Sequence, residues 1–254
     1  MTMDYLVFQL QAPLAAWGEP AVGEYRGSAD RPGESALLGL LGAALGITRE
    51  DEAALQHLQA GYMFAVGVQS TGTLLRDYHT AQVPGRSTLK GRPHATRADE
   101  LAVPRHELNT ILSTRDHRQD AACLVAVQAC ADAPHALSAL AGALCAPRFV
   151  LYLGRKACPL AAPLWPQVVA SDSVLNAFEG YRELLRAQAA PHADRWGRAA
   201  VESPSPVRSL SWADGVEAGV AAQLSAPRKD RVIRRSRWQF GDRIEHTAML
   251  KEEA

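Results

Sequence analysis

The chain has 254 residues, of which 47% are hydrophobic, so it is long and apolar enough for one large domain or two small ones, which argues against global disorder. Lysine plus arginine and aspartate plus glutamate both number 27, so the net charge is zero and total charge gives no indication of a nucleic-acid partner. No run of about 18 apolar residues occurs and the first residues lack the pattern of a secretory signal, so we expect no membrane span and no export.

The first expected element is a strand over residues 3–10. Tyr5 and Val7 alternate with Leu6 and Phe8, which places apolar side chains on both faces. We therefore expect both faces of this strand to be covered.

A long loop marked by glycine and proline follows, from residue 16 to residue 34. It carries Tyr25, Arg26 and Arg31. The loop is longer than most connections between elements, which favours a segment that is functional or held by a partner.

Two helices are expected next, over residues 35–45 and 48–61. The first contains Gly39, Gly42 and Gly46, which lie roughly on one helical face. Each glycine weakens a helix by about 1 kcal/mol relative to alanine, and close packing against a strand or a partner chain would offset that loss. The spacing is not that of a GxGxxG nucleotide-binding loop, so we favour packing.

Strands are expected over residues 63–68 and 73–80, and the apolar period then disappears from residue 81 to residue 109. The segment without apolar period is rich in proline and glycine, and its basic residues are Arg86, Lys90, Arg92, Arg97 and Arg105. A short strand is expected again at 110–114. We interpret this segment as a protruding hairpin arm, with a disordered loop as the alternative.

The second half repeats the order strand, helix, strand, over residues 122–129, 132–144 and 149–153. The chain therefore has the order β-α-β, insertion, β-α-β. This is the split pattern of an α+β, ferredoxin-like fold of the kind found in RNA-recognition (RRM-type) modules.

One stretch combines the expected strand at 149–153 with cations on either side. Arg148 precedes the strand, and Gly154, Arg155 and Lys156 follow it. Two adjacent cations at the end of a buried strand are held rigidly at a sheet edge, which suits the phosphates of a nucleic acid.

The C-terminal part gives weaker signals: a helix over 175–189, an irregular stretch over 191–227, and a final strand pair over 233–244 that would form a small β extension. Between residues 228 and 243 there are two acids and seven cations, namely Arg228, Lys229, Arg231, Arg234, Arg235, Arg237 and Arg243. A segregated basic strip can bind a polyanion even in a neutral protein. A solvated charged tail is the alternative.

The four cysteines form no CxxC pair and no Cys/His set with zinc spacing. We therefore expect no metal and no cofactor. Reduced, buried thiols in a cytoplasmic protein are the simplest interpretation.

Three motifs stand out: SALLGLLGAALGI at residues 35–47, LRDYHT at 75–80 and YLGRKACPL at 152–160. In their order and spacing over residues 3–175 they resemble the CasD family, the Cas-five-family subunits of Cascade, which is the type I-E CRISPR surveillance complex. The C-terminal basic run resembles the family more loosely.

The resemblance implies a ferredoxin-like RAMP domain over residues 1–170, with a β-hairpin thumb at about 76–115, and a C-terminal extension over 171–254. It implies binding of the crRNA 5′ handle beside CasC-type backbone subunits and the CasA-type large subunit, with target DNA met only indirectly. It also implies no catalysis, because a separate endoribonuclease, CasE, cuts the precursor RNA.

The candidate RNA-binding residues are Tyr25, Arg26, Tyr78, His79, Arg86, Lys90, Arg92, Arg97, Arg105, Arg148, Arg155, Lys156, Arg228 and Lys229. Within this set, Arg155 and Lys156 are the first choice for handle phosphates. Tyr25 and Arg26 would stack on or clamp a splayed base, and base–aromatic stacking contributes about 1–3 kcal/mol per base. Tyr78 and His79 would contact bases, with a tyrosine of the core as the alternative for Tyr78.

Two other functions stay open. A metal-independent endoribonuclease needs a base, an acid and a cation, which Tyr78, His79 and Lys90 or Arg92 would supply. The eight histidines show no pairing pattern, so we assign no catalytic residue. The other alternative is a structural adaptor with no direct RNA contact.

Overall fold

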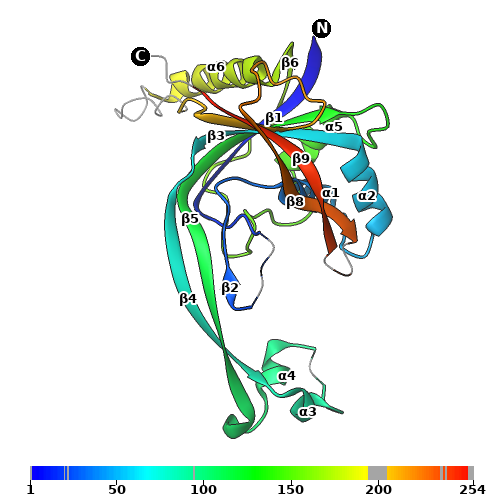
Figure 1. Ribbon diagram of the computed structural model, residues 1–254, viewed down its shortest axis with the longest axis vertical. Coiled ribbons are helices and arrows are strands. Elements are labelled where there is room, and N and C mark those ends of the chain that lie inside the picture. Colours follow the sequence, from blue (N-terminus) through cyan, green and yellow to red (C-terminus); the bar gives the residue numbers. More distant parts are fainter. Residues whose placement is uncertain are drawn as a thin grey trace.

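The computed structural model describes residues 2–19, 21, 23–93, 95–193, 205–234, 237 and 239–250 (Figure 1). The strands are β1 (Met3–Ala15), β2 (Tyr25–Arg26), β3 (Tyr62–Ser70), β4 (Thr73–Pro84), β5 (Leu108–Ala129), β6 (Gln167–Ser171), β7 (Ser209–Ala213), β8 (Leu224–Arg234) and β9 (Gln239–Met249). The helices are α1 (Glu34–Leu45), α2 (Glu52–Gly61), α3 (Arg86–Leu89), α4 (Arg97–Leu101), α5 (Leu137–Cys145), α6 (Val174–Ala193) and the 3-10 helix η1 (Arg105–Glu107). No described helix is both long and apolar enough to cross a membrane.

The described strands form one nine-stranded sheet with the order β6-β1-β5-β3-β7-β9-β8, and β2 and β4 pair with β5 beside this path. All neighbours along the path are antiparallel. The fold is therefore a mixed α and β structure built on a large antiparallel sheet.

Strand β5 belongs to two parts of the molecule. Its residues 108–119 pair with β4, and its residues 122–129 pair with β3 in the body. Figure 1 shows the β4–β5 ribbon leaving the body as a long thumb that carries α3 and α4 at its tip. At the junction, Gly72 (φ 66°) lies against the backbone of Gln119, and Asp120 also has a positive φ of 56°. These two left-handed residues turn the ribbon away from the body sheet.

Helices cover both faces of the body sheet, as the alternation in β1 predicts. Leu6 and Phe8 belong to a core cluster with α1 and α5, and Tyr5 and Val7 belong to a second cluster with α6. All four side chains are fully buried. The predicted coverage of both faces is confirmed.

The strand predicted over residues 149–153 is wrong. The backbone N–H groups of Arg148 and Phe149 donate to carbonyl oxygens at the C-terminal end of α1, so they are not available to a sheet. Tyr152 forms only an isolated bridge, and the side chains of Phe149 and Val150 are 45% and 82% exposed. The position beside β1 is taken by β6 instead.

Three other expectations need correction. The strands expected over 110–114 and 122–129 are one continuous strand, because the polar residues between them pair with β4 in an exposed ribbon that needs no apolar period. The stretch expected to be irregular contains β7 and the start of β8. The final strand pair begins at Leu224, earlier than expected; residues 194–204 and Arg235 lie outside the described residues.

Candidate nucleic-acid interface

Three strands meet at the root of the thumb. The short strand β2 pairs with β5 on one side, and β4 pairs with β5 on the other, so that Tyr25 and Tyr78 both lie opposite Thr114. Side chains of paired residues point to the same face, and neighbours along a strand point to opposite faces. The root therefore has two chemically different faces.

We call one of them the tyrosine face; it consists of Tyr25, Arg76, Tyr78 and Asp116. Tyr25 donates its hydroxyl to Asp116 Oδ2 at 2.5 Å, and Arg76 Nε donates to Asp116 Oδ1 at 2.9 Å. The Arg76 guanidinium carbon also lies 5.4 Å from the centroid of the Tyr25 ring. The ion pair is internally neutral, and Tyr25 and Tyr78 are 49% and 65% exposed. An exposed, neutral, aromatic surface suits a base better than a phosphate.

Hydrogen bonding shifts the pKa values of two groups on the tyrosine face, Asp116 and Tyr25. The bond from Arg76 holds the pKa of Asp116 below its usual range, and the bond to Asp116 raises the pKa of Tyr25. Both shifts indicate that the Asp116 carboxylate stays ionised and the Tyr25 phenol stays protonated at neutral pH.

We call the opposite surface the cationic face; it consists of Arg26, Arg115, His117 and Arg155, together with the acid Asp77, which pairs with Arg115 in the β4–β5 register. Arg155 Nη1 donates to the carbonyl oxygen of Asp116 at 2.9 Å and Nη2 donates to that of Arg26 at 3.1 Å. Its Nη1 also lies 3.0 Å from His117 Nε2. Burial and the nearby Arg115 lower the pKa of Arg155. Arg155 thus joins β2 to β5, and Lys156, the next residue, is exposed.

Gly154 allows Arg155 to reach this place. Its φ is 86°, and a Cβ here would lie 1.7 Å from the carbonyl oxygen of Ala16. The backbone N–H of Ala16 in turn donates to the carbonyl oxygen of Leu153 at 3.0 Å. Only glycine fits where these two segments cross.

The side chains of Tyr78 and His79 lie on opposite faces of β4 and cannot contact the same group. As neighbours in β4 they point to opposite faces, and His79 Nδ1 lies 3.8 Å from Asp77 Oδ2. His117 is 8% exposed, and burial followed by the charge of Arg155 lowers its pKa. Among the described residues no group of three or more His, Cys, Asp or Glu side chains is arranged to hold a metal ion.

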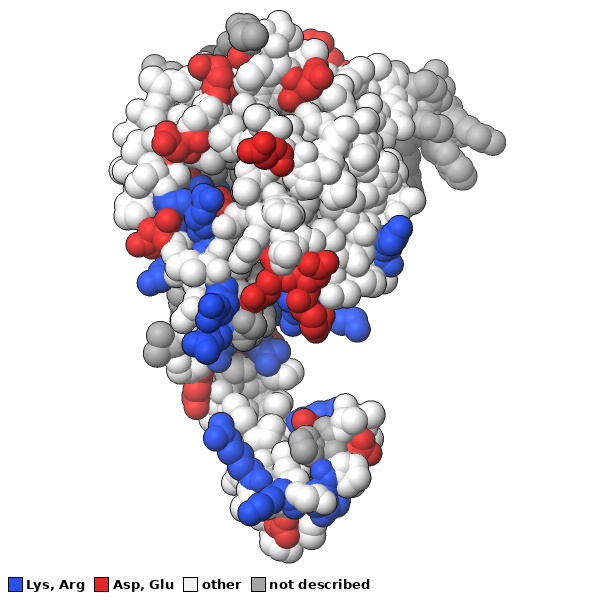
Figure 2. All heavy atoms as spheres, turned by 90° about the vertical axis from the view of Figure 1, so that its right-hand side faces the viewer, with Lys and Arg blue, Asp and Glu red and all other residues white. Residues whose placement is uncertain are grey.

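The basic residues of the thumb tip divide into two kinds. Arg92 donates to the carbonyl oxygen of Ala102, and Arg97 donates to that of Gln82 and pairs with Glu100 at 2.5 Å, so both stabilise the tip. The other three candidates are Arg86, Lys90 and Arg105, and all five are exposed. Figure 2 shows several Lys and Arg side chains along the thumb, among uncharged surface and a few Asp and Glu side chains.

Comparison with known proteins decides the family. A family model described as "CRISPR-associated protein (Cas_Cas5)" matches residues 5–243. The chain belongs to the Cas5 family. It is 37% identical over 172 residues to the "CRISPR system Cascade subunit CasD" of Escherichia coli (strain K12), an alignment that covers 64% of this chain and 70% of that protein.

Two solved structures show the same fold at lower identity. A chain of a "CRISPR RNA-guided surveillance complex" aligns with 96% of this Cas5 chain and 89% of its own length, at a TM-score of 0.60 and 23% identity. A chain described as "Crystal structure of Cas protein" aligns with 98% of this chain and 96% of its own length, at a TM-score of 0.58 and 22% identity. At this identity the likeness bears on the fold alone.

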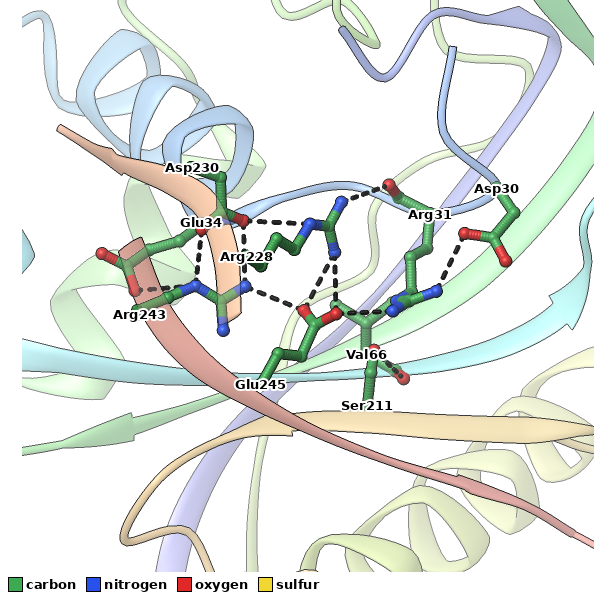
Figure 3. A network of polar contacts seen from close by, with 9 residues as sticks. All are labelled: Asp30, Arg31, Glu34, Val66, Ser211, Arg228, Asp230, Arg243 and Glu245. Carbon is green, nitrogen blue, oxygen red and sulfur yellow. Dashed lines mark hydrogen bonds and ion pairs between the residues drawn. The ribbon is translucent and has the colours of Figure 1, made fainter. Parts of the chain in front are cut away.

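Two arginines of the C-terminal basic strip of this Cas5 chain, Arg228 and Arg243, are held in a partly buried ion-pair network, whereas Lys229, Arg231, Arg234 and Arg237 are exposed. Arg228 and Arg243, from β8 and β9, pair with Glu245 at 2.9 and 2.8 Å, and Arg31 from the long loop pairs with it at 2.5 Å (Figure 3). The Arg228 side chain is 20% exposed. It therefore holds the β8–β9 hairpin to the loop, whereas Lys229 is exposed on the same strand.

Within the described part of the chain, Arg148 contacts the C-terminal end of α1 and not the thumb root. Its side chain packs against Gly46, the left-handed residue that ends α1, and it is exposed. Nothing in its described contacts joins it to the thumb root.

The residues that organise the tyrosine face were not predicted from the sequence. Arg76 lies inside the LRDYHT motif, and Asp116 lies in a polar stretch of β5 with no apolar period. The LRDYHT motif contained the signal for Arg76: in a strand, residues two apart share a face, so Arg76 is expected on the same face as Tyr78.

The ionised state of Asp116 gives a pH prediction. Its folded pKa is below the ordinary aspartate value of about 3.9, so its contribution to stability is present above that value and is lost as the pH falls through the folded pKa. We expect Asp116→Asn to be less stable than the wild type at pH 7, and this difference to shrink at pH 3. Urea denaturation at both pH values measures it, with the exposed Asp132→Asn as the control that should show little difference at either. A difference that is unchanged at pH 3 would contradict the assignment.

Proposed function

We propose that this Cas5-family chain is the non-catalytic subunit of a type I-E CRISPR surveillance complex (Cascade) that holds the 5′ handle of the crRNA. The observation that carries the proposal is the 37% identity to a Cascade subunit over 70% of that relative. The thumb root supports it, because cations and exposed tyrosines from three separated segments converge there. Such a mixture of charge and aromatic surface is typical of single-stranded nucleic-acid sites.

The proposal includes partners. A chain that holds one end of a guide RNA would lie beside CasC-type backbone subunits and a CasA-type large subunit, in the cytoplasm, and would meet target DNA only through them. The thumb supports such contacts, since Leu74 and Ile111 are 46% and 50% exposed on a ribbon outside the core. Exposed apolar residues on an extended ribbon favour a partner that covers them.

We also infer that the body contains a ferredoxin-like unit of the RAMP type. Its four strands would be β1, β3, β5 and β6. Their order β6-β1-β5-β3, all antiparallel, supports this, with α1 and α2 between β1 and β3 and α5 between β5 and β6. This is the arrangement of the split β-α-β pattern.

The geometry gives little support to the endoribonuclease alternative. A base and an acid have to reach one phosphate, but Tyr78 and His79 point to opposite faces of β4. His117 is buried and lies beside Arg155, which disfavours a role as general base. Incubation of the protein with its repeat RNA tests this: specific cleavage that disappears in His79→Ala would replace the binding proposal by an enzymatic one.

The test of the binding proposal is purification from the native cells through a tag. We expect RNA of one uniform length and several other subunits to co-purify. Arg26→Ala with Lys156→Ala is expected to weaken RNA binding and to reduce the slope of log affinity against log salt by roughly 0.7 per lost phosphate contact. The control is Arg186→Ala, an exposed cation of α6 on the other side of the sheet. Subunits without RNA crosslinks would support the adaptor, and absence of both would overturn the proposal.

A further inference from the structure

The tyrosine face has the dimensions of a site for one flat group. Tyr25 and Tyr78 lie on the two sides of Thr114, each one strand away from it. Neighbouring strands are about 4.8 Å apart, so the two tyrosine positions are about 10 Å apart. Stacked aromatic pairs have centroids about 4.5–7 Å apart, so a ring inserted between two others needs about 9–14 Å. The short side chain of Thr114 lies between the two tyrosines, and the Arg76 guanidinium carbon lies 5.4 Å from the centroid of the Tyr25 ring.

The contacts of Tyr25 fix its ring before any ligand arrives. Asp116 is 2% exposed and accepts hydrogen bonds from the Tyr25 hydroxyl and from Arg76. Arg76 Nη2 lies 3.3 Å from the Tyr25 hydroxyl oxygen, so the three side chains are mutually in contact. Asp116 is enclosed by these partners, so its carboxylate orients the ring and is not itself exposed to a ligand.

The side chains of the cationic face and those of the tyrosine face lie on opposite sides of the thumb root. Arg26 follows Tyr25 in β2, and Arg115 precedes Asp116 in β5, so the cations point away from the tyrosines. A nucleotide at the tyrosine face meets aromatic surface and a neutral ion pair, whereas a phosphate is favoured on the opposite face. This arrangement suits an unpaired base whose backbone passes around the edge of the ribbon.

We propose that Tyr25 and Tyr78 form a sandwich site for a single unpaired RNA base, and that Asp116 and Arg76 are positioning residues that hold Tyr25 in the stacking orientation. The inference rests on the proposed function, because it takes the ligand to be the guide RNA.

The test uses the RNA that co-purifies with the protein, remade synthetically with an abasic substitution at each position in turn. We expect one position at which loss of the base weakens binding about 5- to 150-fold, the size of a lost base–aromatic stack. In Tyr78→Ala that abasic RNA and the intact RNA should bind equally well, because the stacking partner is already gone. Thr80→Ala, which lies on the same face of β4 two residues along, is the control and should keep the full difference.

The positioning role has its own readout. Asp116→Asn is expected to lower the pKa of the Tyr25 phenol toward its ordinary value, seen as a shifted tyrosine step in an ultraviolet titration. Asp116→Asn and Tyr25→Ala should be non-additive in RNA affinity, whereas a general structural role would make them additive.

The outcomes separate the two proposals. RNA that binds tightly with no position sensitive to base removal overturns the sandwich site and leaves the proposed function intact. Failure of any RNA to co-purify overturns the proposed function, and the sandwich site with it. A sensitive position that remains sensitive in Tyr78→Ala places the base elsewhere and overturns the assignment of the face.

Discussion

Replacing Glu245 by alanine is expected to lower the free energy of unfolding by about 3–5 kcal/mol, the usual cost of breaking a buried ion pair from one side. Glu245 is 7% exposed and lies among Arg31, Arg228 and Arg243. Without its carboxylate, three guanidinium groups remain close together and partly buried. Their mutual repulsion and lost hydrogen bonds oppose folding of the β8–β9 hairpin onto the body.

The network has a second carboxylate whose position adds to this effect. Asp230 pairs with Arg243 at 2.7 Å and accepts a hydrogen bond from the backbone N–H of Glu34 at 2.9 Å, at the first turn of α1. Gly33, which precedes the helix, makes no side-chain cap, so a residue 196 positions away along the chain supplies it. Loss of the hairpin therefore also uncaps α1.

Chemical denaturation measures the effect, together with hydrogen exchange of β8, β9 and the long loop. The matched control is Asp242→Ala, which removes an exposed acid from the same strand and is expected to change stability by less than about 0.5 kcal/mol. Glu245→Gln keeps the shape and should fall between the two. A Glu245→Ala variant as stable as the Asp242→Ala variant would show that the network contributes nothing to folding.

Replacing Gly154 by alanine is expected to cost about 3–5 kcal/mol. The residue has φ 86°, which alone disfavours alanine by about 1–2 kcal/mol, and the new Cβ would overlap the carbonyl oxygen of Ala16. To avoid that overlap, either the loop that carries Tyr25 or the segment that carries Arg155 has to move. RNA affinity should therefore fall along with stability.

The control for this substitution is Gly142→Ala in α5. No atom lies within 4 Å of the Cβ position there, so alanine should stabilise the helix by about 0.5–1 kcal/mol. Thermal denaturation of both variants compares a glycine required by backbone geometry with one that is not. If Gly154→Ala melted with the wild type, the described crossing of the two segments would be wrong.

Local sequence patterns were sufficient to predict some elements of the fold. The alternation of Tyr5, Leu6, Val7 and Phe8 predicted a strand covered on both faces, and the lost apolar period after residue 80 predicted the protruding arm. Both are properties of neighbouring residues, which periodicity reports directly.

The remaining features depend on contacts between distant residues. The apolar run at 149–153 is typical of a strand, but hydrogen bonds to α1 remove it from the sheet. Asp116 meets Tyr25 across 91 positions, and Arg228 meets Arg31 and Glu245 through a fold that no local pattern describes. Arginines that bind RNA and arginines that bind a buried carboxylate have the same local sequence signature, so only the three-dimensional arrangement separates them.

The direction in which the arm points is a property of the main chain itself. Gly72 and Asp120 set the bend by their left-handed conformations, and the uninterrupted β5 carries that orientation from the middle of the body outward. The direction of the arm is therefore set within this chain, before a transcript or a neighbouring subunit binds. Little conformational entropy is then lost when the assembly forms around it, so more of the contact free energy is retained as affinity.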